Sequence, residues 1–256
     1  MDDLRADLQL AATLVREAGH LAASMRAEGL AASHKTSLSD IVTAADHAAE
    51  AHVVARLRAF RPDDSILGEE GAAHQGTSGR TWVIDPVDGT WNFFHGLDWW
   101  CSAIALTTDD DVVLGAIHHP ATDTTYAGGP GHPATRDGLP LASLGDLGVH
   151  EVCAATYLHP DRHTTPVGAA WRRAVARPAT LRVLGSGSMD AVAVATGILG
   201  VSFQHDVPLW DRLPGEALVR SLGGVREEVE AGGVTWNVLG LPTAAGEVVT
   251  ALRDER

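Results

Sequence analysis

The stretch Trp82–Phe93 constrains the fold of this chain most, because a short apolar run ends there in two closely spaced aspartates. A strand over the apolar run would carry Asp85 and Asp88 out of the core at its end. The Gly89-Thr90 pair would then open a short helix, whose free N–H groups favour an anion. Carboxylates beside an anion site are consistent with a cation between them. The alternative is an ordinary hairpin turn with solvated aspartates, because Asp-Gly is common in such turns.

Hydrophobic periodicity predicts helices followed by strands in the first half of the chain. Apolar residues recur at helical spacing over residues 3–28, which predicts an amphipathic helix ending near Gly29. A second helix is predicted from Thr43 to the residue before Pro62. Short apolar runs then predict strands at 66–67, 81–84, 100–107 and 111–118, the last two as an antiparallel hairpin.

The pattern changes across residues 128–148, which are rich in Gly, Pro and Asp and are the best candidate for a boundary between two halves. Beyond them, short apolar runs alternate with helical patterns. Helices are predicted at 167–176, 188–196 and 212–222, and strands at 152–156, 181–184, 201–203, 235–239 and 248–252. This alternation predicts an α/β layer packed on an α+β layer.

The charge of the chain limits its partners. A formal net charge of −14 would repel a nucleic-acid backbone or an anionic membrane, so we expect neither as a partner. A phosphate-bearing substrate would need metal ions to offset that repulsion. The N-terminus lacks the basic and apolar segments of a signal peptide, and no run of about 18 apolar residues occurs. Cys101 and Cys153 lie far apart in apolar runs, so we interpret them as reduced core thiols of a cytoplasmic protein.

Acidic residues stand at the ends of several predicted apolar elements, namely Glu69, Asp85, Asp88 and Asp211. Magnesium prefers oxygen ligands, and two-metal sites share carboxylates between ions about 3.5–4 Å apart. These four side chains would supply such a cage, with Asp85 bridging and the backbone carbonyl of Val87 as a further ligand. Because the chain has 33 acidic residues, a solvated loop carboxylate is the alternative for each one taken singly.

Three further patterns are open to two interpretations. Thr43-x-x-Asp46 resembles a capping box, a role that needs no catalysis. The turn Gly185-Ser186-Gly187-Ser188 follows a predicted strand and opens a helix, which makes it a weak candidate for phosphate binding. It does not fit the Gly-x-Ser-x-Gly frame of a nucleophilic serine. His118 and His119 would point to opposite faces of a strand, which favours solvated or core histidines over a pair of metal ligands.

Four separated segments together resemble the inositol monophosphatase family. They are Asp40-Ile41-Val42-Thr43-x-x-Asp46, Gly68-Glu69-Glu70, Trp82–Phe93 and Trp210-Asp211, in the family's order and at about its spacings. The resemblance implies an α+β fold, a layered α-β-α-β-α sandwich, with an antiparallel sheet in the N-terminal half and a mixed sheet in the C-terminal half. Residues 1–140 would carry most metal ligands, and residues 141–256 would carry Asp211 and the substrate-side residues.

The resemblance also implies magnesium-dependent hydrolysis of a small phosphate monoester, frequent inhibition by lithium and a homodimer. Two or three Mg²⁺ ions would be held by Glu69, Asp85, the Val87 carbonyl, Asp88, Thr90 and Asp211. Asp85 would be shared by the ion that activates water and the ion that stabilises the departing alkoxide. Glu69 would also contact a weaker third ion.

The same resemblance assigns catalytic and phosphate-binding roles. Asp46 would accept a hydrogen bond from Thr90 and act in a general-base relay, together with Glu69 at the water-activating ion. The amides of Gly89 and Thr90 would hold the phosphate oxygens. Lys35 matches a lysine near the metal site in relatives, although a solvated loop lysine is an equally simple interpretation.

The substrate side departs from the family pattern. Asp88, Ser186, Gly187 and Gln204 would contact the substrate, and Gln204 stands where inositol-specific relatives have a glutamate. A glutamine carries no charge and donates as well as accepts, which weakens inositol phosphate as the specific substrate. The aromatic residues Trp91, Trp99 and Trp100 lie close to the motif in sequence, and a flat leaving group such as imidazole becomes plausible if any of them lines the pocket. Pro214 falls in the first turn of the predicted helix 212–222, where proline is tolerated.

These observations favour a magnesium-dependent phosphomonoesterase acting on inositol 1-phosphate or a similar small polyol monophosphate. The alternative enzyme is a histidinol-phosphate phosphatase on the same fold. A regulatory protein that binds metal and phosphate without turnover is a third hypothesis, which the complete set of expected ligands disfavours.

Overall fold

The structure is a computed structural model that describes residues 2–29, 32–34, 41–109 and 111–254. Its helices are α1 (Asp2–Glu28), α2 (Ala44–Phe60), α3 (Thr90–Phe94), α4 (Pro166–Val175), α5 (Gly187–Ala195), α6 (Leu209–Ser221) and α7 (Pro242–Arg253), with the short 3-10 helices η1 (Pro120–Thr122), η2 (Val149–Glu151) and η3 (Pro160–Arg162). Within these described ranges, none of the helices has the length and apolar character needed to span a membrane.

An eight-stranded sheet forms the N-terminal part of the molecule. Its spatial order is β10-β9-β8-β7-β6-β5-β3-β4, and neighbours pair antiparallel except β3 and β5, which are parallel. The strands are β3 (Ser65–Gly68), β4 (Ala73–His74), β5 (Arg80–Asp88), β6 (Cys101–Thr108), β7 (Asp111–His119), β8 (Thr124–Gly129), β9 (His132–Arg136) and β10 (Leu139–Pro140). A separate antiparallel pair joins β1 (Ala32–His34) to β2 (Ile41–Thr43).

A five-stranded mixed sheet follows, in the order β12-β11-β13-β15-β14. Its strands are β11 (Cys153–Thr156), β12 (Thr180–Arg182), β13 (Val201–His205), β14 (Val225–Ala231) and β15 (Val234–Gly240). The strand β11 pairs parallel with both β12 and β13, whereas β15 pairs antiparallel with β13 and β14.

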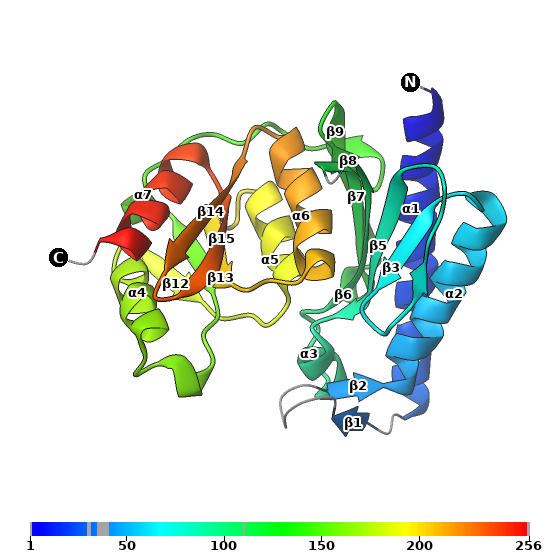
Figure 1. Ribbon diagram of the computed structural model, residues 1–256, viewed down its shortest axis with the longest axis horizontal. Helices are drawn as coiled ribbons and strands as arrows, with labels where there is room; N and C mark the ends of the chain where they lie inside the picture. The colour runs from blue at the N-terminus through cyan, green and yellow to red at the C-terminus, as the bar shows by residue number, and fades with distance from the viewer. Residues whose placement is uncertain (1, 30–31, 35–40, 110, 255–256) are drawn as a thin grey trace.

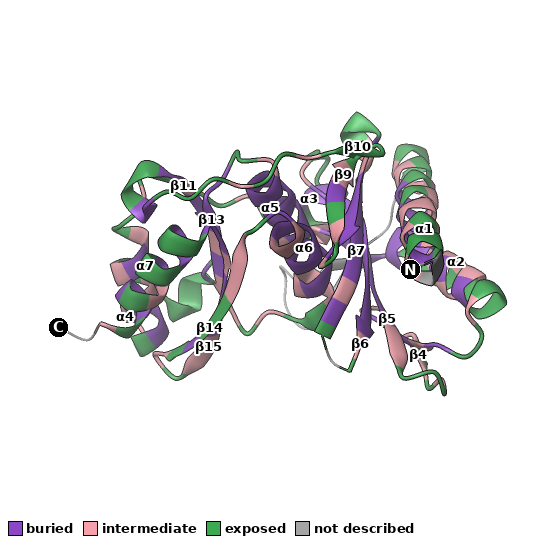
Figure 2. Cartoon of the chain, turned by 90° about the horizontal axis from the view of Figure 1, so that it is seen from above, coloured by how far each residue is buried: buried purple, intermediate pink, exposed green. Residues whose placement is uncertain are grey.

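The elements stack in five layers (Figure 1). The helices α1 and α2 cover the outer face of the eight-stranded sheet, α5 and α6 lie between the two sheets, and α4 and α7 cover the outer face of the five-stranded sheet. Every residue of α5 from Ser188 to Ala195 is buried, as expected for a helix covered on both sides (Figure 2). The predicted α+β fold, a layered α-β-α-β-α sandwich, is confirmed. Because β3 and β5 pair parallel, the N-terminal sheet is mixed, whereas we expected an antiparallel sheet.

Close packing between layers fixes where α6 lies. A Cβ atom on Gly115 of β7 would sit 2.3 Å from the carbonyl oxygen of Pro214 in α6, so only glycine permits this approach. The helix α6 begins at Leu209, three residues earlier than the sequence predicted. Pro214 therefore lies inside the helix, whereas the sequence predicted it in the first turn. The earlier start also places Asp211 within the first turn of α6.

The strand predicted at 248–252 is wrong, because these residues belong to the helix α7. The local run Val-Val-Thr-Ala-Leu suits a strand, but the period becomes helical once the preceding alanines are included. The buried residues of α7 are Ala244, Ala245, Val248, Ala251 and Leu252, spaced as one face of a helix. Pro242 at the first helical position marks its start.

Several other boundaries differ from the prediction. The region 128–148, which is rich in Gly, Pro and Asp, contains the strands β9 and β10. The chain therefore leaves the eight-stranded sheet only after Pro140. The strand predicted at 181–184 ends at Arg182. Among the cysteines, Cys101 is buried as predicted, whereas Cys153 is only partly buried, and both are free thiols.

Candidate active site

The two aspartates of the central motif lie inside β5, not beyond its end. This strand continues to Asp88, whereas the sequence predicted that it would stop at Ile84. Its pairing with β6 shifts register between Asp85 and Asp88, which is the irregularity expected where Pro86 has no N–H to donate. A hydrogen bond from β6 stabilises the irregularity, because Ser102 Oγ donates to the Pro86 carbonyl at 2.6 Å. Both aspartates are thereby fixed on rigid sheet structure.

Asp85 is the centre of a cluster of carboxylates in which Asp85 and Asp88 are buried and Glu69 and Asp211 are partly buried. Burial raises the pKa of Asp85 well above its usual range, and the negative charges of Glu69, Asp88 and Asp211 raise it further. A hydrogen bond with the carboxyl group of Asp211 acts in the same direction. Four carboxyl groups this close repel one another unless protons or cations lie between them. Oxygen donors in such an arrangement are the ligands that hard divalent cations prefer, so the residues fit magnesium.

Asp88 connects β5 to the start of α5. The backbone N–H groups of Gly187 and Ser188 donate to its two carboxylate oxygens at 3.1 and 2.5 Å. Burial raises the pKa of Asp88, while these amide hydrogen bonds act against that shift. The predicted turn 185–188 therefore does open a helix, with Ser186 as its N-cap accepting from Met189 N–H. Because the Gly187 amide is bound to Asp88, its donor is already engaged within the protein.

Thr90 lies between Val87 and Asp46. Its hydroxyl oxygen is 3.0 Å from the Val87 carbonyl and 3.3 Å from Asp46 Oδ1. A hydroxyl has a single proton, so it donates to one of these two acceptors at a time. The positive φ of Gly89, +93°, turns the chain from β5 into the five-residue helix α3, which begins at Thr90. The geometry thus links the motif to α2.

Asp46 makes both of the contacts between which the sequence left a choice. It forms a capping box with Thr43, whose N–H and hydroxyl donate to Oδ2 at 3.0 and 2.5 Å. Its other oxygen, Oδ1, accepts from the Thr90 hydroxyl. Burial raises the pKa of Asp46, against the effect of the hydrogen bonds from Thr43. A buried carboxylate with a raised pKa is better suited to accept a proton than a solvated one.

A cavity of about 760 Å³ collects most of the predicted site residues. Those that line it are Glu69, Asp85, Val87, Asp88, Gly89, Thr90, Ser186, Gly187, Gln204 and Asp211. They come from β5, β13 and the beginnings of α3, α5 and α6, together with the residue after β3. Asp46 is not among the lining residues and lies behind Thr90. The volume suits a small metabolite with bound ions.

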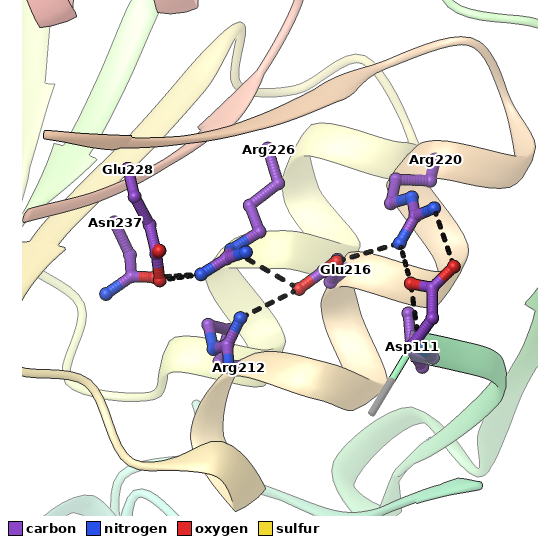
Figure 3. A network of polar contacts seen from close by, with 8 residues as sticks. Asp111, Arg212, Glu216, Arg220, Arg226, Glu228 and Asn237 are labelled. Carbon is purple, nitrogen blue, oxygen red and sulfur yellow. Dashed lines mark hydrogen bonds and ion pairs between the residues drawn. The ribbon is translucent and has the colours of Figure 1, made fainter. Parts of the chain in front are cut away.

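A network of charged side chains anchors the α6 wall of this region (Figure 3). Buried Glu216 contacts the guanidinium groups of Arg212, Arg220 and Arg226 at 3.3, 3.0 and 3.5 Å. Arg220 also pairs with Asp111 of β7 at 2.7 Å. The network therefore ties α6, which carries Asp211, to both sheets. Arg212, Glu216 and Arg226 also border a small cavity of about 40 Å³ beside Gln204 and Asp211.

Some cavity residues were missed by the sequence reasoning. Tyr157 and His159, in the segment after β11, line the cavity and lie 3.3 Å apart at Tyr157 Oη and His159 Nδ1. They follow a predicted strand, but no motif distinguishes them. Of the three tryptophans near the motif, Trp91 lines the cavity and is 45% exposed, whereas Trp100 is buried in the core. The positions of Lys35 and Asp40 lie outside the described residues.

The sequence is similar to that of known phosphatases. The sequence matches the inositol monophosphatase family over residues 3–254. It is 31% identical over 218 residues to a fructose-1,6-bisphosphatase/inositol-1-monophosphatase of Thermotoga maritima, covering 85% of this chain and 83% of that protein. It is 31% identical over 215 residues to an inositol-1-monophosphatase of Rhizobium meliloti, covering 82% of this chain and 78% of that protein.

Solved structures agree with the sequence comparison. The structure of a Thermotoga maritima IMPase superposes with a TM-score of 0.83 at 29% identity, covering 98% of this chain and 97% of that one. Mycobacterium tuberculosis SuhB gives a TM-score of 0.81 at 27% identity, covering 97% and 96%. The fold is therefore that of the solved structures of this family. The chain belongs to the inositol monophosphatase family.

Proposed function

We propose that this protein is a magnesium-dependent phosphomonoesterase that hydrolyses inositol 1-phosphate or a similar small polyol monophosphate. The observation that carries the proposal is the crowding of Glu69, Asp88 and Asp211 around buried Asp85 at the wall of a cavity. Such crowding raises the free energy of the ion-free site and is relieved by divalent cations. The same cavity has room for a small phosphorylated metabolite, which is the substrate class that the family supports.

Two or three Mg²⁺ ions would be held by Glu69, Asp85, the Val87 carbonyl, Asp88, Thr90 and Asp211. When bound, such ions supply a water of lowered pKa and neutralise the charge of the phosphate and the leaving alkoxide. The peptide amides at Gly89 and Thr90 would hold phosphate oxygens where β5 turns into α3.

The chain's own proton relay consists of Thr90 and Asp46. When the Thr90 hydroxyl donates to Asp46 Oδ1 and one of its lone pairs faces the proposed ion, the other lone pair can accept a hydrogen bond from a water molecule in the cavity. The proton of that water then passes to Thr90, and the Thr90 proton passes to Asp46 Oδ1. Thr43 holds Asp46 in place through Oδ2, so Oδ1 is left to face Thr90. General-base catalysis of this kind contributes about 10²–10⁴-fold to a rate.

Residues outside the motif Trp82–Phe93 would mainly determine the selectivity for the leaving group. Asp88, Ser186, Gly187 and Gln204 would contact it, with Gln204 offering a neutral amide from β13. Trp91 offers a flat aromatic surface at the cavity wall. The aromatic surface favours histidinol phosphate as a second candidate substrate, because imidazole stacks on an aromatic ring.

Phosphate release from a panel of monoesters, with and without magnesium and with added lithium, tests the proposal. Asp88→Asn should lower kcat by at least about 10²-fold, because it removes the charge of a proposed ligand. The matched control is Asp63→Asn, which changes an exposed aspartate between α2 and β3 and should leave the rate unchanged. Equal rates for both variants, or a rate independent of magnesium, would overturn the proposed metal-dependent mechanism. No phosphate release from any monoester would favour a regulatory binding protein.

The substrate panel decides between the two candidates. A higher kcat/KM for inositol 1-phosphate supports the first, and a higher value for histidinol phosphate supports the second. Gln204→Glu should shift the ratio toward polyol phosphates, since a carboxylate accepts hydrogen bonds from vicinal hydroxyls.

We also propose a homodimer, a cytoplasmic location and division of the chain into halves at residues 1–140 and 141–256. The change of sheet after Pro140 supports the division. The free thiols Cys101 and Cys153 support a reducing compartment. Light scattering on the purified protein measures the oligomeric state directly.

A further inference from the structure

Three potential metal ligands from separate segments converge on the α1 side of the eight-stranded sheet. His20 lies in α1, His118 in β7 and Asp123 directly after η1. His20 Nε2 is 2.8 Å and His118 Nε2 is 3.8 Å from the same oxygen, Asp123 Oδ1. One ligand atom from each residue lies within 4.8 Å of the other two. None of the three lines the acidic cavity.

His118 presents an unsatisfied nitrogen to this cluster. Its side chain is fully buried, and Nε2 has no hydrogen-bond partner among the described residues. The other ring nitrogen, Nδ1, lies 2.9 Å from Thr125 Oγ1 on the neighbouring strand. With the proton on Nδ1 donated to Thr125, the Nε2 lone pair faces the cluster. Metal-ligating histidines are commonly oriented in this way, with the second nitrogen donating to a fixed acceptor.

The backbone is shaped to let the three side chains meet. A Cβ atom on Gly19 would lie 2.7 Å from His118 Cδ2, so a glycine in α1 makes room for the imidazole ring. Asp123 has a φ of +48°, a left-handed conformation that aspartate tolerates better than most residues. His119, the next residue in β7, turns away and contacts the Asp98 carbonyl through Nε2 at 2.8 Å. His118 and His119 thus face opposite sides of the sheet, as the sequence predicted.

The protonation states of His118 and Asp123 suit a metal ligand set, and the proton that His20 Nε2 donates to Asp123 would be released when an ion binds. Burial lowers the pKa of His118 to about 4, helped by positive charge on His20 and Arg16, while the Asp123 carboxylate acts against the shift. His118 is therefore neutral near pH 7 and has a lone pair to give. The hydrogen bond from His20 lowers the pKa of Asp123, so this carboxylate is ionised.

We propose that His20 Nε2, His118 Nε2 and Asp123 Oδ1 bind a divalent transition-metal ion, with Zn²⁺ as the best fit. Zinc bonds of about 2.0–2.1 Å in tetrahedral geometry separate ligand atoms by about 3.3 Å, which lies between the two observed contacts to Asp123. Imidazole nitrogen selects zinc over magnesium, so this site differs in chemistry from the all-oxygen cluster around Asp85. The half-exposed side chain of His20 leaves a fourth position open to water.

Binding at this zinc site would join α1 to the end of β7 and to the turn at Asp123. One link to the cavity runs through β6, where Ser102 pairs with His118 and donates to the Pro86 carbonyl. The inference does not depend on the proposed phosphatase activity, because metal binding is measured without substrate.

Zinc titration of the full chain against a chromophoric chelator tests the proposal. The protein is first freed of metal and then kept in millimolar magnesium, which occupies oxygen-only sites. We expect one tight zinc equivalent, weakened at least about tenfold in His20→Ala and in Asp123→Asn. Both residues are more than half exposed, so neither variant removes core packing. The matched control is His132→Ala in β9 of the same sheet, which should bind zinc as the wild type does.

Two further measurements separate this site from the acidic cavity. Asp88→Asn should keep the zinc equivalent, because it alters only the cavity. Cobalt in place of zinc should give the visible absorption of a four-coordinate site in the wild type and lose it in His20→Ala. The proposal is wrong if His20→Ala binds zinc as tightly as the control, or if Asp88→Asn abolishes the zinc equivalent.

Discussion

Replacing Glu216 by glutamine removes a buried negative charge that three arginines contact in the network of Figure 3. The side chains of Arg212, Arg220 and Arg226 are 17%, 31% and 23% exposed, so part of their charge is already hydrated. Arg220 keeps its pair with Asp111 after the change. Arg226 keeps its contacts with Glu228 and Asn237. The loss therefore falls mainly on Arg212.

Breaking a buried ion pair by removing one partner lowers stability by about 3–5 kcal/mol. Because the partners of Glu216 are partly exposed and two of them keep other partners, we expect the lower end, about 3 kcal/mol. In a domain of this size about 1 kcal/mol shifts Tm by about 2–4 °C, so Tm should fall by about 6–12 °C. Glu216→Gln keeps the shape of the side chain, which limits the change to its charge.

Urea and thermal unfolding followed by circular dichroism measure this effect. The control is Glu228→Gln, which removes a carboxylate that contacts the same Arg226 but is 49% exposed. It should cost less than about 1 kcal/mol, as exposed ion pairs do. If both variants shift the urea midpoint equally, the network contributes no more than a surface pair and the reasoning fails. If magnesium binds as proposed, a higher magnesium concentration should be needed for half-maximal activity, since the proposed ligand Asp211 precedes Arg212 in α6.

Two further predictions concern proton chemistry. Thr90→Val should lower kcat by about 10²-fold or more with the fold unchanged. Thr90→Ser should retain most activity, because the hydroxyl is kept. Equal loss of activity in both variants would show that Thr90 is not part of the relay. With chelator present, acid should reduce stability as His118 is protonated. Its folded pKa, about 4, lies below the ordinary 6.5, so its contribution is present above pH 6.5 and is lost as pH falls toward 4. Tm between pH 7 and 4 should therefore fall more steeply in the wild type than in His118→Gln.

Local patterns were sufficient to predict much of the fold and of the candidate site. The long apolar stripe of α1, the cap at Thr43 and the hairpin of β6 and β7 are each encoded within a few turns or strands, and the structure confirms them. The carboxylates of the acidic cavity were found because they stand next to apolar runs. Their convergence at one cavity depends on tertiary packing. Only the resemblance to a family predicted this convergence.

Features without a local signal were missed. The strand β14 (Val225–Ala231) contains Glu227, Glu228 and Glu230, and this acidity hid its strand character, although charges are common on an edge strand. The helix α7 was misread because a window of five residues cannot separate a period of two from one of 3.6. The cluster at His20 joins residues about a hundred positions apart, so no spacing pattern revealed it.

The hydrogen bonds from Gly187 and Ser188 to Asp88 make the orientation of Asp88 dependent on complete folding of the chain. A carboxylate supplied by the first sheet is held by amides that exist only after α5 has formed and docked. A truncated or half-folded chain would therefore present Asp88 to water with its orientation lost. With Asp88 as a proposed metal ligand, hydrolysis of a phosphate ester would be a sensitive indicator of complete folding, able to detect partial opening between layers before the helices themselves melt.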